Sequence, residues 1–104
     1  MNIANTPETP YYAVIFTSVL SSATAEYTKM AEEMEQLAKT QPGFLGIESA
    51  RNELGITVSY WETEEAISQW KQHASHLFAQ QRGREEWYKK YHVRVCRVER
   101  AYRF

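Results

Sequence analysis

The stretch GITVSYWETEEAISQWKQHASHL, residues 55–77, decides the fold, because a strand pattern passes directly into a helix pattern within it. Before Trp61, apolar side chains alternate with Thr and Ser, which is the two-residue period of a pleated strand. Thr63 follows, and its hydroxyl can accept a hydrogen bond from the first amides of a helix. Glu64 and Glu65 then place negative charge in the first helical turn, where the helix dipole favours it. The stretch therefore predicts a strand followed at once by a helix.

Three large side chains follow at three-residue spacing in this predicted helix: Trp70, His73 and His76. In an unbroken helix they lie roughly along one side. That arrangement is typical of a ligand site, and it is equally typical of a hydrophobic seam with histidines at its flank. Both interpretations stay open at this point.

Length and composition describe an ordinary globular domain. The chain has 104 residues, of which 43% are hydrophobic and 24% are charged, so we expect one domain with its own core. The formal net charge of -1 gives no basic excess, and we expect no nucleic-acid partner. The single cysteine, Cys96, cannot form an internal disulfide, which agrees with a reducing compartment. No apolar run reaches about 20 residues and the N-terminus resembles no signal peptide, so we expect a cytoplasmic protein without membrane contact.

The remaining elements are predicted from the spacing of apolar residues along the chain. Residues 1–10 contain two prolines and few apolar side chains, and they predict a flexible arm ahead of one domain over residues 11–104. The predicted elements are a strand over 11–20, a helix over 27–38, and strands over 44–50 and 55–61 joined by a turn. Helical surface follows from Glu64, with a bend near Ser75, a kink or break near Gly83, and further apolar surface at Trp87, Tyr88 and Tyr91. The last strand is predicted over 93–104, and the switch of its apolar face at Val95 and Cys96 predicts either a bulge or a strand that leaves one partner for another.

This order of strand, helix, two strands, helix and strand is that of the split βαβ arrangement. It predicts an α+β, ferredoxin-like fold with a four-stranded antiparallel sheet and helices on one face. The other face would stay apolar, since Tyr11, Ala13, Ile15 and Val19 share it. A second copy of the chain, packed sheet to sheet about a two-fold axis, is the simplest cover. We therefore expect a homodimer with a cavity between each sheet and its helices.

Three motifs resemble those of the antibiotic biosynthesis monooxygenase domain, a family of dimeric α/β barrels. They are QPGFLGIES at Gln41–Ser49, VSYWETEEAISQW at Val58–Trp70, and His76 followed by RGREEWY at Arg82–Tyr88. The resemblance covers almost the whole chain apart from the N-terminal arm. It implies the fold more firmly than the activity, because family members include cofactor-free oxygenases, haem-degrading enzymes and proteins of unassigned role.

The resemblance implies a cofactor-independent monooxygenase that acts on a small aromatic molecule, phenol-like or quinol-like. Such an enzyme needs a dry pocket, a base, and hydrogen-bond donors for the substrate anion. Tyr12 and Thr17 point to opposite sides of the first strand, so the register decides which of them faces the pocket. The candidate catalytic residues are His76, Trp61 and His73, and the candidate substrate-binding residues are Trp70, Tyr60, Tyr12 and Thr17.

Two other functions stay open on the sequence. One is a non-catalytic dimeric module that binds a small aromatic or hydrophobic molecule, and the other is a haem-binding or haem-degrading protein. The haem-degrading branch of the family implies an asparagine on the first strand, where this chain has Thr17 or Ser18, and an iron-ligand histidine near the position of Gln80. Haem is therefore disfavoured, and no cofactor is expected. His73 and His76 lack an evident third ligand, so no metal site is expected either.

Overall fold

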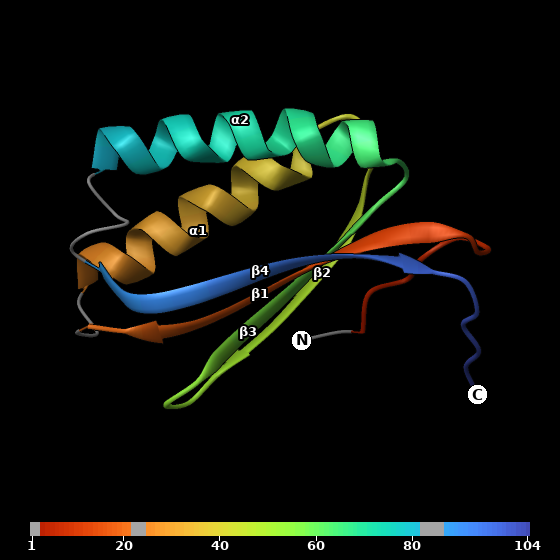
Figure 1. Ribbon diagram of the computed structural model, residues 1–104, viewed down its shortest axis with the longest axis horizontal. Helices are drawn as coiled ribbons and strands as arrows, with labels where there is room; N and C mark the ends of the chain where they lie inside the picture. The colour runs from red at the N-terminus through yellow and green to blue at the C-terminus, as the bar shows by residue number, and fades with distance from the viewer. Residues whose placement is uncertain (1–2, 22–24, 82–86) are drawn as a thin grey trace.

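The computed structural model describes residues 3–21, 25–81 and 87–104, which form a sheet with two helices packed on it (Figure 1). No helix among these residues is long and apolar enough to cross a membrane. The elements along the chain are β1 (Tyr11–Leu20), α1 (Ala25–Lys39), β2 (Phe44–Arg51), β3 (Gly55–Trp61), α2 (Glu64–Gln81) and β4 (Tyr88–Val98).

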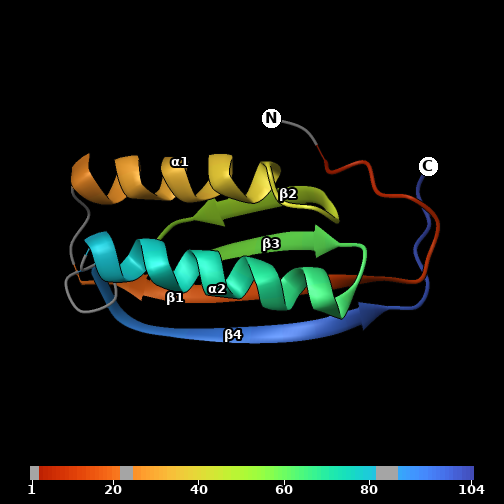
Figure 2. The same ribbon diagram turned by 90° about the horizontal axis from the view of Figure 1, so that it is seen from above.

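The four strands form one antiparallel sheet in the order β2-β3-β1-β4. Both helices lie on the same side of this sheet (Figure 1), and the view from above places β4 along the sheet edge (Figure 2). The predicted α+β, ferredoxin-like fold is confirmed. The central position of β1 agrees with its sequence, because both of its faces carry apolar side chains.

The core lies between the sheet and the helices. The two faces of β1 follow its two-residue period: the even-numbered residues from Tyr12 to Ser18 face the helices, and the odd-numbered residues from Tyr11 to Val19 face away. We call these the helix-side face and the outer face of the sheet. The buried centre of the core is Ala38, Trp61, Ala66 and Ile67, with Tyr12, Val14, Phe44 and Trp70 packed around it.

The start of α2 is fixed by Thr63. The Ala66 amide donates a hydrogen bond of 3.0 Å to the Thr63 hydroxyl, so Thr63 caps the helix as the sequence predicts. The helix then packs closely on the turn before β2, where Gly43 has a φ of 83°. A Cβ at Gly43 would lie 2.7 Å from the Ala66 Cβ. Glycine therefore serves both the turn conformation and the close contact.

The predicted bend of α2 near Ser75 is wrong, because the helix continues from Glu64 to Gln81. Ala74 and Leu77, on either side of Ser75, are both half-buried. They continue the inward-facing stripe at helical spacing, and a serine on the exposed side of such a helix interrupts nothing. The predicted break at Gly83 lies outside the described residues.

The bounds of β4 also differ from the prediction, which gives a strand over 93–104. The strand begins at Tyr88 and ends at Val98, because it pairs with β1 over that range. Beyond this pairing, Tyr102 and Phe104 are fully exposed. The bulge predicted at Val95 and Cys96 is wrong as well, since the register changes opposite the end of β1, between Val19 and Leu20.

The N-terminal residues 3–10 lie against the outer face of the sheet. The Ala4 amide donates to the Glu48 carboxylate at 2.9 Å, and the Thr6 hydroxyl donates to the Tyr11 hydroxyl at 2.9 Å. The arm is therefore outside the helix-side core, as the sequence predicts. Its flexibility and the domain boundary at residue 11 stay predictions.

Candidate functional site

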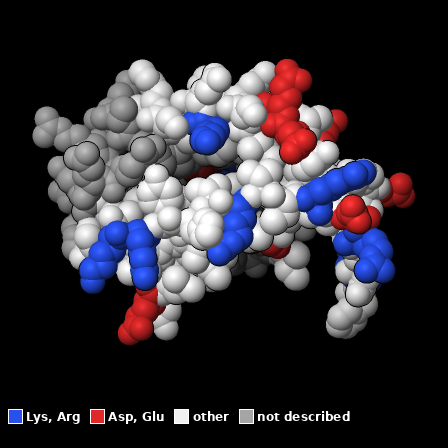
Figure 3. Space-filling view, viewed as in Figure 1, with Lys and Arg blue, Asp and Glu red and all other residues white. Residues whose placement is uncertain are grey.

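Part of the helix-side face of the sheet is open to solvent along β4. Tyr91, Val93 and Val95 stand opposite residues of β1 that face the helices, so they belong to the same side. They are nevertheless 40%, 45% and 52% exposed, respectively. Figure 3 shows the molecule hollowed at this place, between α2 and β4. We call this hollow the edge cleft, and its floor is formed by Phe16, Tyr91, Val93 and Val95.

The floor of the edge cleft is apolar and aromatic. Phe16 stacks on Tyr91, with ring centroids 5.4 Å apart and an angle of 27° between the ring planes. The Tyr88 ring meets both of them edge-on, at 5.4 Å from Phe16 and 5.8 Å from Tyr91. Exposed valines beside such a group of rings form a surface that a flat apolar molecule can cover.

The two tryptophans predicted for the site lie together at one end of the helix-side face. Trp61 is fully buried, and it stacks on Trp70 with ring centroids 5.9 Å apart. The Trp61 indole N–H donates to the Ser59 hydroxyl at 2.8 Å. Trp61 is thus a core residue whose polar atom already has a partner, whereas Trp70 is half-buried. Tyr12 packs against the same cluster.

The predicted catalytic histidines lie on the exposed part of α2. Trp70 belongs to the inward-facing stripe of this helix. At 3.6 residues per turn, His73 is displaced by about 60° and His76 by about 120° from Trp70 around the helix axis. Both histidine side chains are exposed. The structure therefore does not bring His73 and His76 together with Trp61, and their catalytic role stays a prediction.

Of the remaining predicted ligand residues, the register places Tyr12 on the helix side, whereas Thr17 and Tyr60 lie on the outer face. The Tyr60 hydroxyl donates to Glu48 at 2.7 Å, and its ring meets Tyr11 edge-on at 5.9 Å. Burial, followed by the hydrogen bond and the charge of Glu48, raises the pKa of Tyr60 to about 12. Thr17 and Tyr60 cannot line the same cavity as Trp70.

A polar cluster that the sequence analysis does not predict lies at the other end of the helix-side face. Arg51 donates to the Ser18 hydroxyl, to the Ser18 carbonyl at 3.4 Å and to the Tyr27 hydroxyl at 3.4 Å. Its guanidinium carbon lies 5.6 Å from the centroid of the Tyr27 ring. Burial raises the pKa of the nearby Tyr88 hydroxyl, and the hydrogen bond with Tyr27 acts in the same direction. We call Arg51, Ser18, Tyr27 and Tyr88 the arginine cluster.

The arginine cluster depends on Gly55. This residue pairs with Ser18 on one side and with Arg51 on the other, so the arginine side chain must cross it to reach Ser18. A Cβ at Gly55 would overlap the guanidinium group. A serine in the otherwise apolar helix-side row of β1, with a glycine directly opposite, is the sequence feature from which the cluster could have been found.

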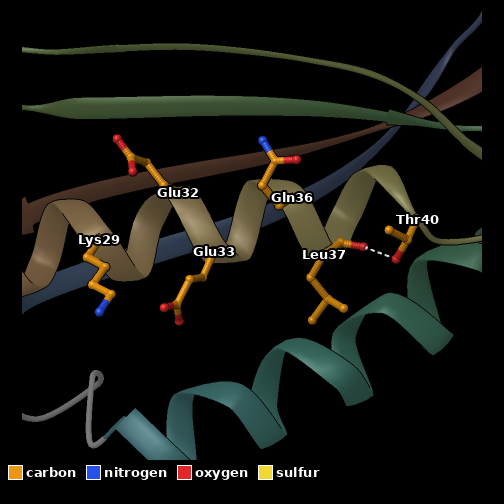
Figure 4. Close-up of a pocket in the computed structure, with 6 residues that line it drawn as sticks. All are labelled: Lys29, Glu32, Glu33, Gln36, Leu37 and Thr40. Carbon is orange, nitrogen blue, oxygen red and sulfur yellow. Dashed lines mark hydrogen bonds between the residues drawn. The ribbon is translucent and has the colours of Figure 1, made fainter.

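A second hollow, of about 590 Å³, lies along α1 and contains none of the predicted site residues (Figure 4). In Figure 4, the Thr40 hydroxyl donates to the Leu37 carbonyl at 2.7 Å. Five of its six lining residues are charged or polar, so it resembles a solvated helix flank more than a ligand pocket. Its lining residues are Lys29, Glu32, Glu33, Gln36, Leu37 and Thr40.

The described part of the chain brings together no group of three His, Cys, Asp or Glu residues that could hold a metal ion. Of the two first-strand candidates for the haem-branch asparagine position, Ser18 faces the helices and Thr17 does not. Gln80 lies in α2, and its side chain is outside what the structure describes. No residue is therefore assigned to a metal or to haem.

The protein is thus a small α+β protein with an open, aromatic surface between a four-stranded sheet and a helix. Residues 10–82 match the family model described as antibiotic biosynthesis monooxygenase. The chain therefore belongs to this family.

One curated protein and two solved structures are similar to this chain. The chain is 51% identical over 100 residues to the uncharacterised protein YqjZ of Bacillus subtilis (strain 168), and the match covers 94% of this chain and 88% of that protein. It is similar in structure to SnoaB, a cofactor-independent oxygenase from Streptomyces nogalater, with a TM-score of 0.73, 11% identity, and coverage of 89% of this chain and 97% of SnoaB. A dabb family protein with a ferredoxin-like fold from Mesorhizobium loti has a TM-score of 0.63 and 13% identity, over 85% of this chain and 96% of that protein. At such low identities the two structures support the fold alone.

Proposed function

We propose that this protein is a cytoplasmic, homodimeric, cofactor-independent monooxygenase that acts on a small electron-rich aromatic molecule. The observation that carries the proposal is the edge cleft, an exposed aromatic and apolar surface on the helix side of the sheet. Membership of the antibiotic biosynthesis monooxygenase family and the structural similarity to SnoaB support it.

The proposed chemistry needs no reduced cofactor. The oxidation of an anthrone, an aromatic ketone with a methylene group between two rings, is an example. A base removes a proton from the methylene carbon, and the anion that forms is delocalised over the rings. This anion transfers electrons to O2, and one oxygen atom bonds to the same carbon. Loss of water then leaves a carbonyl group, so the other oxygen atom departs as water and the substrate supplies all the electrons. The protein has to exclude bulk water, accept a proton and hold the anion.

Within this proposal, the predicted residues take separate places. We assign His73 as the first candidate base and His76 as the second, because His73 lies nearer to the inward-facing side of α2. Trp70 is the proposed wall of the pocket, and Trp61 acts by holding Trp70 in place through their stacking contact. Tyr12 supports the same cluster.

The proposed homodimer concerns the outer face of the sheet. Ile15 and Val58 pair across β1 and β3 on that face, and the neighbouring Ile56 is exposed. The N-terminal arm contacts Glu48 and Tyr11 on this face. A second copy would cover the apolar part of it, and Thr17 and Tyr60 would then lie at the contact between copies.

Oxygen uptake by the purified protein tests the proposed activity. The substrates are a panel of anthrones and dihydroquinones, in the presence of a metal chelator. We expect uptake with at least one of them, and His73→Ala should lower kcat by roughly 100-fold or more if His73 is the base. Gln72→Ala is the matched control, since Gln72 is exposed on the side of α2 away from Trp70 and should leave kcat unchanged.

The same experiment separates the alternative functions. If no substrate is consumed while the corresponding quinones bind, the protein is a small-molecule-binding module and the proposed activity is wrong. A shifted Soret band on addition of haemin would instead favour haem binding.

A further inference from the structure

We propose that the arginine cluster binds the anionic oxygen of an aromatic ligand whose rings lie on the floor of the edge cleft. The inference rests on the proposed function, and it names the substrate class more closely: a hydroxylated aromatic bound as its phenolate. The four residues Arg51, Ser18, Tyr27 and Tyr88 would fix the end of the ligand that carries the charge.

The first argument is the charge of Arg51. Its partners among the described residues are neutral: the hydroxyl and carbonyl of Ser18, and the hydroxyl and ring face of Tyr27. Within the described residues the ion pair found is Lys39 with Glu35, and no carboxylate pairs with Arg51. A guanidinium group held by neutral oxygens keeps its full charge for an anionic ligand.

The second argument is that this guanidinium group is held in place before any ligand arrives. Ser18 is almost completely buried and lies in the central strand β1, so its hydroxyl is a fixed acceptor. Gly55 leaves a flat path across β3 for the arginine side chain. A donor that is already oriented loses less conformational entropy on binding, and this favours a specific anion site.

The third argument is that the arginine cluster and the edge cleft are continuous. Tyr88 belongs to the cluster through Tyr27, with ring centroids 5.7 Å apart, and its ring also meets Phe16 and Tyr91 on the floor of the cleft. Trp61, by contrast, pairs with Tyr12, six residues from Ser18 along β1, which is roughly 20 Å. A ligand whose rings lie on the cleft floor therefore has Arg51 toward one end of the helix-side face and Trp70 toward the other.

The charge of β4 supports the same ligand class. The strand YKKYHVRVCRV contains two lysines and two arginines and no acidic residue. Figure 3 shows basic side chains gathered along this edge of the molecule, beside the hollow. Such a concentration of positive charge raises the local concentration of anions and speeds their encounter with the cleft.

Binding of 4-nitrophenol to the full chain tests the inference, because its phenolate has a visible absorbance band. At a pH near the pKa of 4-nitrophenol, binding should shift the ionisation equilibrium of the probe toward the phenolate, and the phenolate absorbance should rise. Arg51→Gln should weaken phenolate binding roughly tenfold or more, which corresponds to the loss of one charge-assisted hydrogen bond. Gly55→Ala should weaken it similarly, because the added methyl group displaces the guanidinium without changing its charge. Thermal unfolding confirms that each variant is folded.

The matched control is Arg97→Gln, which removes the same charge from the helix-side face of β4, opposite Tyr12. It should leave phenolate binding within about twofold of the original protein. Three outcomes would overturn the inference: no binding of the phenolate, equal binding of 4-nitroanisole, which cannot ionise, or equal losses in Arg51→Gln and Arg97→Gln. Because binding is measured without turnover, absent oxygen uptake with intact Arg51-dependent binding would reject the proposed activity alone.

Discussion

Tyr60 retains its hydroxyl proton well above the ordinary range of a tyrosine. Burial is the main cause, and the hydrogen bond to Glu48 and the charge of that carboxylate add to it, so the pKa of Tyr60 rises from 10.0 to about 12. Since the folded state holds this proton more tightly than the unfolded chain, the contribution to stability is complete below pH 10. We expect it to be lost progressively as the pH rises from 10 to about 12.

Ultraviolet titration of tyrosinate measures this shift. The difference between the curves of the original protein and Tyr60→Phe isolates one tyrosine that ionises near pH 12. Glu48→Gln should move that step to lower pH, though not to the ordinary value, because burial remains. Glu62→Gln, which changes an exposed carboxylate elsewhere, should leave the step in place. A Tyr60 that ionises with an ordinary pKa would show that the Glu48 contact does not form in solution.

For single residues, the spacing of apolar side chains and the residue type predict some structural roles and not others. Thr63 as a helix cap follows from a local pattern, and this position is confirmed. Arg51 is missed because its contacts depend on a long side chain that folds back over a neighbouring strand. A pattern along the chain records which face a residue occupies, but not how far its side chain reaches across that face.

The N-terminus of α2 allows a direct test of how much a capping residue stabilises a helix. The Thr63 hydroxyl satisfies the Ala66 amide, and this amide has no partner within the helix. Thr63→Ala should therefore lower the free energy of unfolding by about 1 kcal/mol, whereas Thr63→Ser should retain most of it. Urea unfolding gives both values from a shift of the midpoint at constant slope. Equal midpoints for the alanine and serine variants would mean that the hydroxyl contributes nothing.

The bounds of the last strand, β4, could not be predicted from the sequence. Trp87, Tyr88 and Tyr91 recur at spacings that also fit a helix, and this pattern competes with the two-residue period that begins at Tyr91. In the structure, the bounds of β4 are set by pairing with β1, from Tyr88 opposite Leu20 to Val98 opposite Tyr11. Such pairing is a long-range property, so local spacing could not place the start of the strand. The switch of its apolar face, from Val95 to Cys96, reflects exposure at the sheet edge rather than a bulge.

For the whole molecule, the order of elements was enough to predict the sheet topology, because a split βαβ order permits few connections. The same order does not say how much of the sheet remains uncovered. The helices cover one face only (Figure 1), and the outer face carries apolar residues of β1 and β3. We propose that a second copy of the chain covers this face. The homodimer can therefore be tested by measuring whether the protein is a monomer or a dimer in solution.

Two valines on opposite faces of the sheet allow that association to be tested with one kind of substitution. Val58 lies on the outer face opposite Ile15, and Val95 lies on the helix side in the edge cleft. We expect a dimer at micromolar concentration by sedimentation, a monomer for Val58→Lys, and a dimer for Val95→Lys, because a charge is costly only where it becomes buried between copies. A stable, folded monomer of the original protein would contradict the homodimer, and a monomer for Val95→Lys would place the contact on the wrong face.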